Sequence, residues 1–143
     1  MSQRENAIGA LFAVLGRLSL GTTVKRNAAL PERIADHAMA ILRDGEMGEP
    51  EVSLSPLTYH WQHQVAIELF VADPDTSTRD ARMDGLLTEL ATLIETDRTL
   101  AGVVDYAEIG QPKFDDLAPE GTSGIKACLL PVVLHYSSSG PLN

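Results

Sequence analysis

The sequence is poor in cysteine, tryptophan and basic side chains. It has one cysteine and one tryptophan, and 11 lysines and arginines stand against 20 aspartates and glutamates. A single cysteine excludes a disulfide within the chain, and the apolar neighbours of Cys128 predict a buried, unreactive thiol. The formal charge of −9 disfavours binding to nucleic acid or to anionic membranes, because both require clustered lysine and arginine. No apolar run approaches the ~20 residues of a membrane-spanning helix.

The sequence also lacks the common motifs of catalysis and metal binding. It has no GxSxG, HExxH or GxGxxG pattern and no P-loop. His60 and His63 flank Trp61 in the stretch HWQH, but the alternation of polar and apolar residues predicts a strand there. On a strand the two histidines point to opposite faces and are not expected to share a metal ion. We therefore expect no catalytic residue, no cofactor and no metal; the alternative is a small transferase or hydrolase that uses His60 or His135 with an acidic partner.

The length and composition predict a single domain. A chain of 143 residues, of which 44% are hydrophobic, can bury one core. We predict one domain over residues 1–143, with a mobile tail from about residue 137. Apolar residues at helical spacing predict amphipathic helices over 3–19 and after the capping cluster DPDTSTRD. Composition and alternation predict strands at 22–26, 51–56, 58–72, 103–110 and 124–137, and QPKFDDLAPEGTSG is predicted to be a polar loop.

This order of elements predicts an α+β domain. Its sheet should be mixed or antiparallel and contain a long β-hairpin, with the two main helices packed on one face. The segment LPERIADHAMAILRDGE, residues 30–46, supports two interpretations. Pro31 at a first-turn position fits a helix that ends before Gly45, whereas AMAILRDGE fits a strand that runs into a turn. Local propensity favours the helix slightly.

The strand from Thr58 to Ala72 is unusually long. At ~3.3 Å per residue it would extend roughly 45–50 Å, beyond the usual ~17–20 Å, so we expect it to overhang its own domain. Amphipathic aromatic residues are enriched where proteins meet. The candidate interface residues are Tyr59, Trp61, His63, Pro131 and Tyr136. For Trp61, burial in the core of its own chain is an equally good interpretation, and Pro131 predicts a bulge or a locally unpaired side in the last strand.

Several phrases of the sequence together resemble a known family. Two of them are the N-terminal helix and the long amphipathic helix. The other three are the stretches ILRDGEMGEPEVSLSPLTYHWQHQVAIELFV, which lies between the two helices, and DRTLAGVVDYAE and IKACLLPVVLHYSS, which follow the second helix. In layout and phrase, over residues 4–137, the chain is similar to the tail-terminator (tail-completion) proteins of siphovirus-like phages, prophages and gene transfer agents. The resemblance implies a homohexameric ring at the head-proximal end of a tail tube, which stops tube growth and provides the joining surface for the neck proteins of the head.

The resemblance carries further implications. Residues 38–46 would form a strand paired with EVSLSP, and we adopt the strand, although His37 stands where a smaller turn residue is expected. The implied partners are other copies of the chain, the tube protein and a head-neck stopper or connector protein, with DNA passing through the ring unbound and no membrane involved. The implied location is the neck of a virion or phage-like particle, assembled in the cytoplasm of a bacterial host.

A ring of six copies at −9 each would carry −54. As a hypothesis, acidic residues that face the lumen keep DNA from sticking as it passes. The candidate residues for this lining are Asp105, Glu108, Asp115, Asp116 and Glu120.

Overall fold

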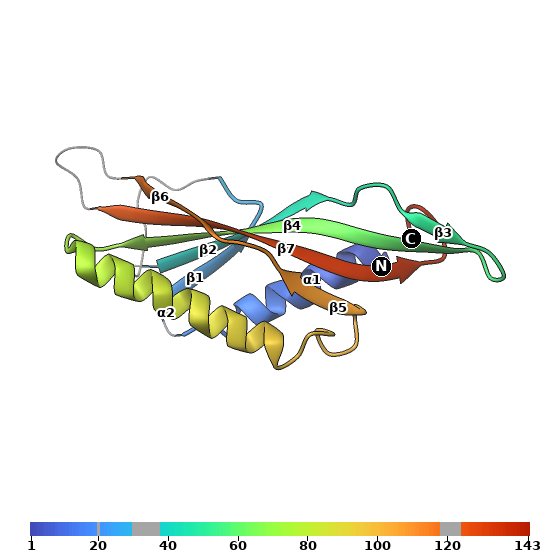
Figure 1. Cartoon of the computed structure of the whole chain (residues 1–143), viewed down its shortest axis with the longest axis horizontal. Coiled ribbons are helices and arrows are strands. Elements are labelled where there is room, and N and C mark those ends of the chain that lie inside the picture. The colour runs from blue at the N-terminus through green and yellow to red at the C-terminus, as the bar shows by residue number, and fades with distance from the viewer. Residues whose placement is uncertain (20, 30–37, 118–123) are drawn as a thin grey trace.

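The computed structural model describes residues 1–19, 21–29, 38–117 and 124–143 (Figure 1). It has an α+β fold, with two helices, α1 (Gln3–Leu15) and α2 (Thr76–Glu95), and one sheet of seven strands. The strands are β1 (Thr22–Arg26), β2 (Ala38–Glu46), β3 (Glu51–Ser53), β4 (Thr58–Ala72), β5 (Tyr106–Ile109), β6 (Lys113–Leu117) and β7 (Ile125–Ser138). The predicted fold class is confirmed.

The sheet is built around the long strands β4 and β7. The strand order is β1-β2-β4-β7-β5, with β3 paired to β4 and β6 paired to β7 beside the main path. Among the described strands only β1 and β2 run parallel; the other pairs are antiparallel, so the sheet is mixed, as predicted. The hairpin of β4 involves only the three residues of β3, and the long antiparallel partner of β4 is β7, which lies far along the chain.

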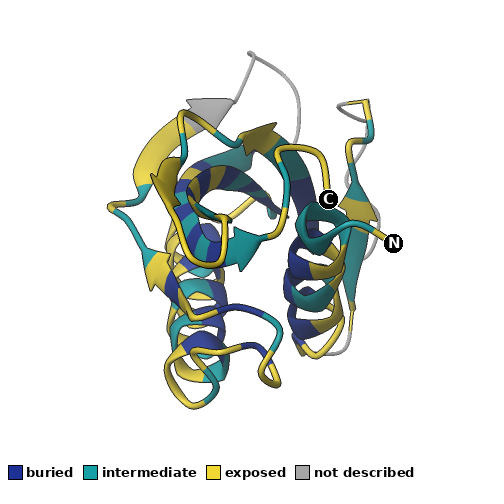
Figure 2. Cartoon of the chain, turned by 90° about the vertical axis from the view of Figure 1, so that its right-hand side faces the viewer, coloured by how far each residue is buried: buried dark blue, intermediate teal, exposed yellow. Residues whose placement is uncertain are grey.

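Both helices begin at side-chain caps and cover the same face of the sheet. The Ser2 side chain accepts a hydrogen bond from the Glu5 amide at α1, and Asp75 accepts one from the Thr78 amide at α2, which satisfies amides that the first helical turn leaves unpaired. The inward stripe of α2 contains Met83, Leu86, Leu90 and Ile94, as its apolar spacing predicts. Figure 2 shows the buried residues gathered where the helices meet the sheet.

The alternation of β4 separates two faces of the sheet. Trp61, Val65, Ile67, Leu69 and Val71 are buried in the main core on the helix side. The opposite face is largely open and polar, except for a small second cluster of Met39, Ile41 and Phe70. A strand with one apolar and one polar face is what a sheet covered on one side requires.

One prediction about the strand at 38–46 is confirmed and one is wrong. Residues 38–46 form the strand that we adopted, against the slight local preference for a helix, because β2 is inserted between β1 and β4 and its Ala40, Ile41 and Leu42 are fully buried. The implied pairing of this strand with EVSLSP is absent, since β3 pairs with β4 instead. His37 lies outside the described residues.

Three further segments differ from expectation. The predicted polar loop after residue 110 contains β6, which pairs with β7. The strand predicted at 51–56 is limited to Glu51–Ser53 and is exposed throughout. β7 continues to Ser138, past the residue where the sequence analysis places the start of the tail.

Pro131 lies where β5 and β6 leave a gap along β7. β5 ends at Ile109 opposite Val132, and β6 begins at Lys113 opposite Leu129. The Pro131 carbonyl accepts a hydrogen bond from the Gly110 amide at 2.8 Å. Because the carbonyl and amide positions of a strand residue face the same side, the donor that proline lacks falls in this gap. This confirms the prediction that the last strand, β7, is locally unpaired on one side at Pro131.

Gly45 marks a bulge in β2. The register with β4 shifts between Arg43 and Glu46, and Gly45 has a φ of +64°. A Cβ at Gly45 would lie 1.8 Å from the Gln64 carbonyl oxygen, so only glycine fits this close approach.

We expect Gly45→Ala to destabilise the protein more than Gly48→Ala. Gly48 also has a positive φ, but a Cβ there would meet nothing within 4 Å, so its substitution costs only the ~1–2 kcal/mol of a left-handed backbone. Gly45→Ala adds overpacking of about 1–3 kcal/mol. Urea unfolding of both variants measures the difference, and equal midpoints would contradict the close approach.

Candidate functional site

Four of the five predicted interface residues lie together on the helix face of the sheet. Trp61 is opposite Tyr136, and Tyr59 stacks on Trp61 with ring centroids 6.3 Å apart. Trp61 is 6% exposed, and Tyr136 and His63 are also buried within the chain. The fifth residue, Pro131, lies apart from them in the gap of β7. The chain itself therefore covers most of the predicted set, and its role between subunits stays a prediction.

Trp61 is held by packing and by a hydrogen bond. Its indole nitrogen donates to the Ser138 hydroxyl at 2.9 Å, and that hydroxyl donates to the Gly140 carbonyl at 2.7 Å. Trp61 thus joins the end of β7 to β4, in line with the interpretation that places it in its own core.

His63 is a buried histidine with both ring nitrogens paired. Nε2 lies 2.6 Å from the Asp44 carbonyl, which can only accept, so we assign the proton to Nε2. Nδ1 then accepts from the Tyr136 hydroxyl at 2.8 Å. Burial lowers the pKa of His63 and raises the pKa of Tyr136 to about 12, so both side chains are neutral at pH 7.

An ion-pair network holds the backbone around Asp44. The Arg26 guanidinium bonds the Asp44 carboxylate through Nε at 2.8 Å and also pairs with Glu5 of α1. The hydrogen bonds from Arg26 hold the pKa of both carboxyl groups below their usual range. This network fixes β1, β2 and α1 relative to one another, and the Asp44 carbonyl is thereby presented to His63.

Beyond these anchors the β3–β4 hairpin projects from the body (Figure 1). We call residues 51–60 the arm. No arm residue is buried. Val52 lies opposite Tyr59 and shares its face of the ribbon, and Leu54 and Leu57 lie in the turn. All three aliphatic side chains are exposed, Leu54 by 77%.

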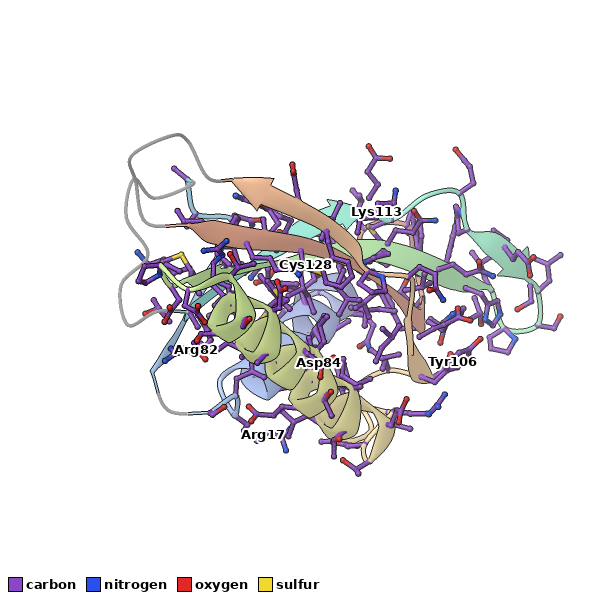
Figure 3. The ribbon with its side chains drawn as sticks, turned by 60° about the vertical axis from the view of Figure 1, so that its left-hand side comes forward. Arg17, Arg82, Asp84, Tyr106, Lys113 and Cys128 are labelled. Atoms are coloured by element: carbon purple, nitrogen blue, oxygen red, sulfur yellow. The ribbon has the colours of Figure 1, made fainter. Side chains whose placement is uncertain are left out.

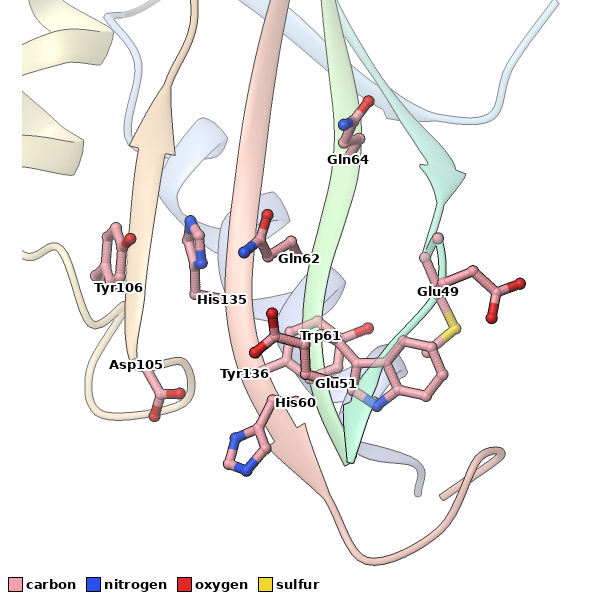
Figure 4. Close-up of a pocket in the computed structure, with 12 residues that line it drawn as sticks. Glu49, Glu51, His60, Trp61, Gln62, Gln64, Asp105, Tyr106, His135 and Tyr136 are labelled. Carbon is pink, nitrogen blue, oxygen red and sulfur yellow. The ribbon is translucent and has the colours of Figure 1, made fainter. Parts of the chain in front are cut away.

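The other face of the arm is polar and borders a cavity of about 420 Å³ on the open side of the sheet (Figure 4). His60 contacts the Ser53 hydroxyl at 2.9 Å. His135 lies 3.2 Å from the Glu108 carboxylate, and Tyr106 stacks on its ring. The cavity is lined mainly by polar and acidic residues of β3, β4, β5 and β7, among them Glu51, His60, Gln62, Asp105 and His135.

The two histidine pairs are independent of each other. His60 and Ser53 are near neighbours across two paired strands, since His60 lies opposite Glu51. His135 and Glu108 come from β7 and β5. A His–carboxylate pair can act as a base, and this is the feature that the enzyme alternative would use.

A second hollow, of about 560 Å³, lies toward the other end of the open face. We call it the groove. Its apolar floor includes Phe70, Ala127 and Leu129, and Phe114 and Lys113 of β6 line it as well. Phe114 is 54% and Leu129 41% exposed. Cys128, labelled with Lys113 in Figure 3, also lines the groove, and burial raises the pKa of its thiol.

The predicted acidic lining falls along one edge of the sheet. Asp105, Glu108 and Asp115 are exposed and lie on or beside β5 and β6, which both pair with the same side of β7. The Asp116 side chain and Glu120 lie outside the described parts.

The comparisons with known proteins find no match: a scan against family models and a search of curated proteins both return nothing. Among the described residues, no group of three or more His, Cys, Asp or Glu side chains is placed to hold a metal ion. No helix in the described parts is long and apolar enough to cross a membrane.

The sequence pattern does not predict that the aliphatic residues of the arm and the groove are exposed. Val52 and Leu54 alternate with polar residues, which is the pattern of a half-buried strand, and nothing local shows that the covering layer ends before them. The groove is not predicted either, because the polar composition of residues 111–124 predicts a loop where β6 forms.

We expect Trp61→Ala to destabilise the chain by about 3–5 kcal/mol, because it empties a buried site. Leu54→Ala, at an exposed site, should stay within about ±0.5 kcal/mol. Urea unfolding measures both, and a small loss for Trp61→Ala would place the indole outside the core.

We also expect stability to fall on acidification through His63. In the unfolded chain the imidazole takes up a proton near its ordinary pKa of 6.5, whereas the buried ring stays neutral to lower pH. The unfolded state then binds more protons, so stability falls as the pH drops below about 6.5, by at most ~1.4 kcal/mol per pH unit. His63→Gln should flatten the pH profile of the unfolding free energy, and an unchanged slope in this variant would contradict the assignment.

Proposed function

We propose that the protein is a structural assembly subunit, a tail terminator that forms a ring capping a phage-like tail tube and joining it to the head-neck complex. The observation that carries the proposal is the arm. It places three aliphatic side chains on a ribbon that projects from the core and is covered by neither helix. Clustered exposed apolar residues are typical of surfaces that meet another protein.

The arm also explains the length of β4. Its fifteen residues continue past the body, so the strand carries the hairpin outward while its inner part remains in the sheet. A rigid extension of this kind suits a permanent contact between subunits, because little conformational entropy is lost when it docks.

The similarity in layout to tail terminators supports the specific role. It would make the ring a homohexamer, with the tube protein on one side and a neck connector on the other. The edge that carries Asp105 and Glu108 would then face passing DNA, and its negative charge would keep the duplex from adhering.

The enzyme alternative rests on the His135–Glu108 pair at 3.2 Å. Both proposals can be separated with one variant. Glu108→Gln should leave assembly unchanged if the ring is the function, whereas an enzyme that uses this pair would lose most of its turnover.

Native mass spectrometry tests the proposal. We expect a hexamer that caps tubes of defined length, and we expect a Val52→Ser, Leu54→Ser, Leu57→Ser variant to stay monomeric with unchanged circular dichroism and melting temperature. Leu142→Ser is the matched control, because Leu142 is as exposed as Leu54, at 77%, but lies outside the arm. A wild-type chain that neither self-associates nor caps tubes would overturn the proposal.

A further inference from the structure

We propose that β1 of one copy pairs with β6 of the next copy, so that the sheets of neighbouring copies join edge to edge. This inference rests on the proposed ring function and names the strands that build the ring. β1 and β6 are each five residues long and lie on opposite edges of the sheet. In the described parts of the chain, no strand pairs with the outer side of either one. Such edges present unpaired amides and carbonyls that another chain can extend.

The two edges lie at the same position along the strands. Lys25 of β1 is in register with Ile41 of β2, which is opposite Glu68 of β4. Glu68 is opposite Leu129 of β7, and Leu129 is opposite Lys113 of β6. One row across the sheet therefore joins β1 to β6, toward the end remote from the arm (Figure 1). A neighbour placed at the same level brings β6 against β1 without a large shift along the strands, as a closed ring requires.

The strand directions define how the edges meet. β1 is parallel to β2 and therefore antiparallel to β4. β6 is antiparallel to β7 and therefore parallel to β4. Copies that stand side by side in the same orientation bring β1 and β6 together as an antiparallel pair.

In β1 the outward backbone groups belong to Val24 and Arg26. The Asn27 amide donates to the Leu42 carbonyl of β2 at 2.8 Å, and successive residues of a strand turn their backbone groups to opposite sides. The amides and carbonyls of Val24 and Arg26 therefore point away from β2. Val24 packs against the main core, so these outward positions carry their side chains on the helix side of the sheet.

In β6 the outward backbone groups include those of Phe114. The Pro131 carbonyl accepts its hydrogen bond on the side of β7 where β5 and β6 pair, and Leu129, two residues away, has the same orientation. Leu129 therefore bonds its partner Lys113, and the next residue, Phe114, turns its backbone outward. Phe114 is opposite Cys128, a residue of the main core, so its side chain lies on the helix side too. The outward residues of both strands thus match in the way that an antiparallel extension of the sheet requires.

Charge selects the register of the pair. Without a shift along the strands, Lys25 would lie opposite Lys113, and like charges opposite each other destabilise a strand pair. A shift of two residues places Lys25 opposite Asp115 instead. Both side chains are exposed and lie on the open side of the sheet. A stagger between strands is also what a closed, tilted sheet uses, so we assign the shifted register.

The same register covers the exposed aromatic ring of β6. Phe114 is 54% exposed. The Lys126 ammonium lies 5.2 Å from the centre of its ring and is already paired with Asp80 of α2. In the joined sheet Phe114 would lie opposite Arg26 and diagonal to Val24 of the next copy, within reach of an aromatic side chain. The neighbouring β1 would therefore supply the apolar stems that cover this ring.

The geometry of the contact determines the type of assembly. β1 and β6 are different surfaces, so the contact is heterologous and produces a ring when the rotation between copies closes. A ladder of five-residue strands falls short of the about 1,000 Å² that a specific interface usually buries. It therefore adds to the contact of the arm and does not replace it. Asp115 would be covered by the neighbour, which leaves Asp105 and Glu108 as the described residues of the predicted lining available to a lumen.

A charge-swap experiment tests the pairing. Lys25→Glu and Asp115→Lys should each raise the protein concentration needed for rings by about tenfold, because each places like charges opposite each other. A chain with both substitutions should assemble like the wild type, because every contact again pairs unlike charges. Native mass spectrometry over a dilution series measures this, and circular dichroism checks the folding of each chain. Arg82→Glu is the matched control, because Arg82 is an exposed cation of α2 away from both edges.

Cysteine pairs test the register. In the shifted register Lys25 and Asp115 form a pair without mutual hydrogen bonds, with Cα atoms about 4.5 Å apart, which a disulfide can span. On oxidation a Lys25→Cys, Asp115→Cys chain should form linked oligomers larger than a dimer, and a Thr23→Cys, Asp115→Cys chain, which fits the unshifted register, should not. Within one chain the two edges are four strand spacings apart, about 19 Å, too far for an internal bond. Native Cys128 is buried and common to all chains.

The outcomes separate the inference from the proposed function. Wild-type rings, with Lys25→Glu and Asp115→Lys chains that assemble at the wild-type concentration, would overturn the β1–β6 contact and leave the ring function standing. Dimers that are insensitive to Lys25→Glu would show β6 paired with itself, Lys113 opposite Asp115, and would also overturn it. Linkage through Thr23→Cys but not through Lys25→Cys would overturn the assigned register. A wild-type chain that never self-associates, even with tail tubes, would remove both the contact and the ring function.

Discussion

The pairing of β4 with β7 is the constraint on which the rest of the structure depends. Their register is unbroken from Tyr59 opposite Ser138 to Ala72 opposite Ile125. β2 and β3 use the free side of β4, β5 and β6 use the free side of β7, and α2 packs against both strands. A slip of one residue would turn the buried face of β4 toward solvent, so the core and the strand register specify each other.

The same pairing explains how an unburied hairpin keeps a defined direction. The arm gains little from burial, and its backbone is held by β3 on one side and the end of β7 on the other. At its base Trp61, His63 and Tyr136 pack and hydrogen-bond beneath the sheet. Trp61, His63 and Tyr136 thus support the arm from within the chain, and a role for them between subunits stays a prediction.

Much of the fold could be predicted from periodicity, because burial on one face imposes it. The alternation of β4 and the stripe of α2 reflect a single covering layer, and both were predicted. For 38–46, local propensity slightly favours a helix, and only the family resemblance favoured the strand that forms; the polar composition of 111–124 predicted a loop where β6 forms, since neighbouring strands decide both segments. The candidate site was predicted least well: aromatic residues signal burial and contact alike, and the exposure of Leu54 depends on where the helices end.

The continuity of β4 has a consequence for the size of an assembly. The arm and the body are two ends of one twisted strand, so the twist accumulated between them sets the direction in which the arm leaves the body. In the proposed ring, the direction of the arm, and with it the number of copies, would be encoded in the interior of the sheet. Substitutions that change the twist of β4 or the bulge at Gly45 would alter the symmetry of the ring without touching its interface.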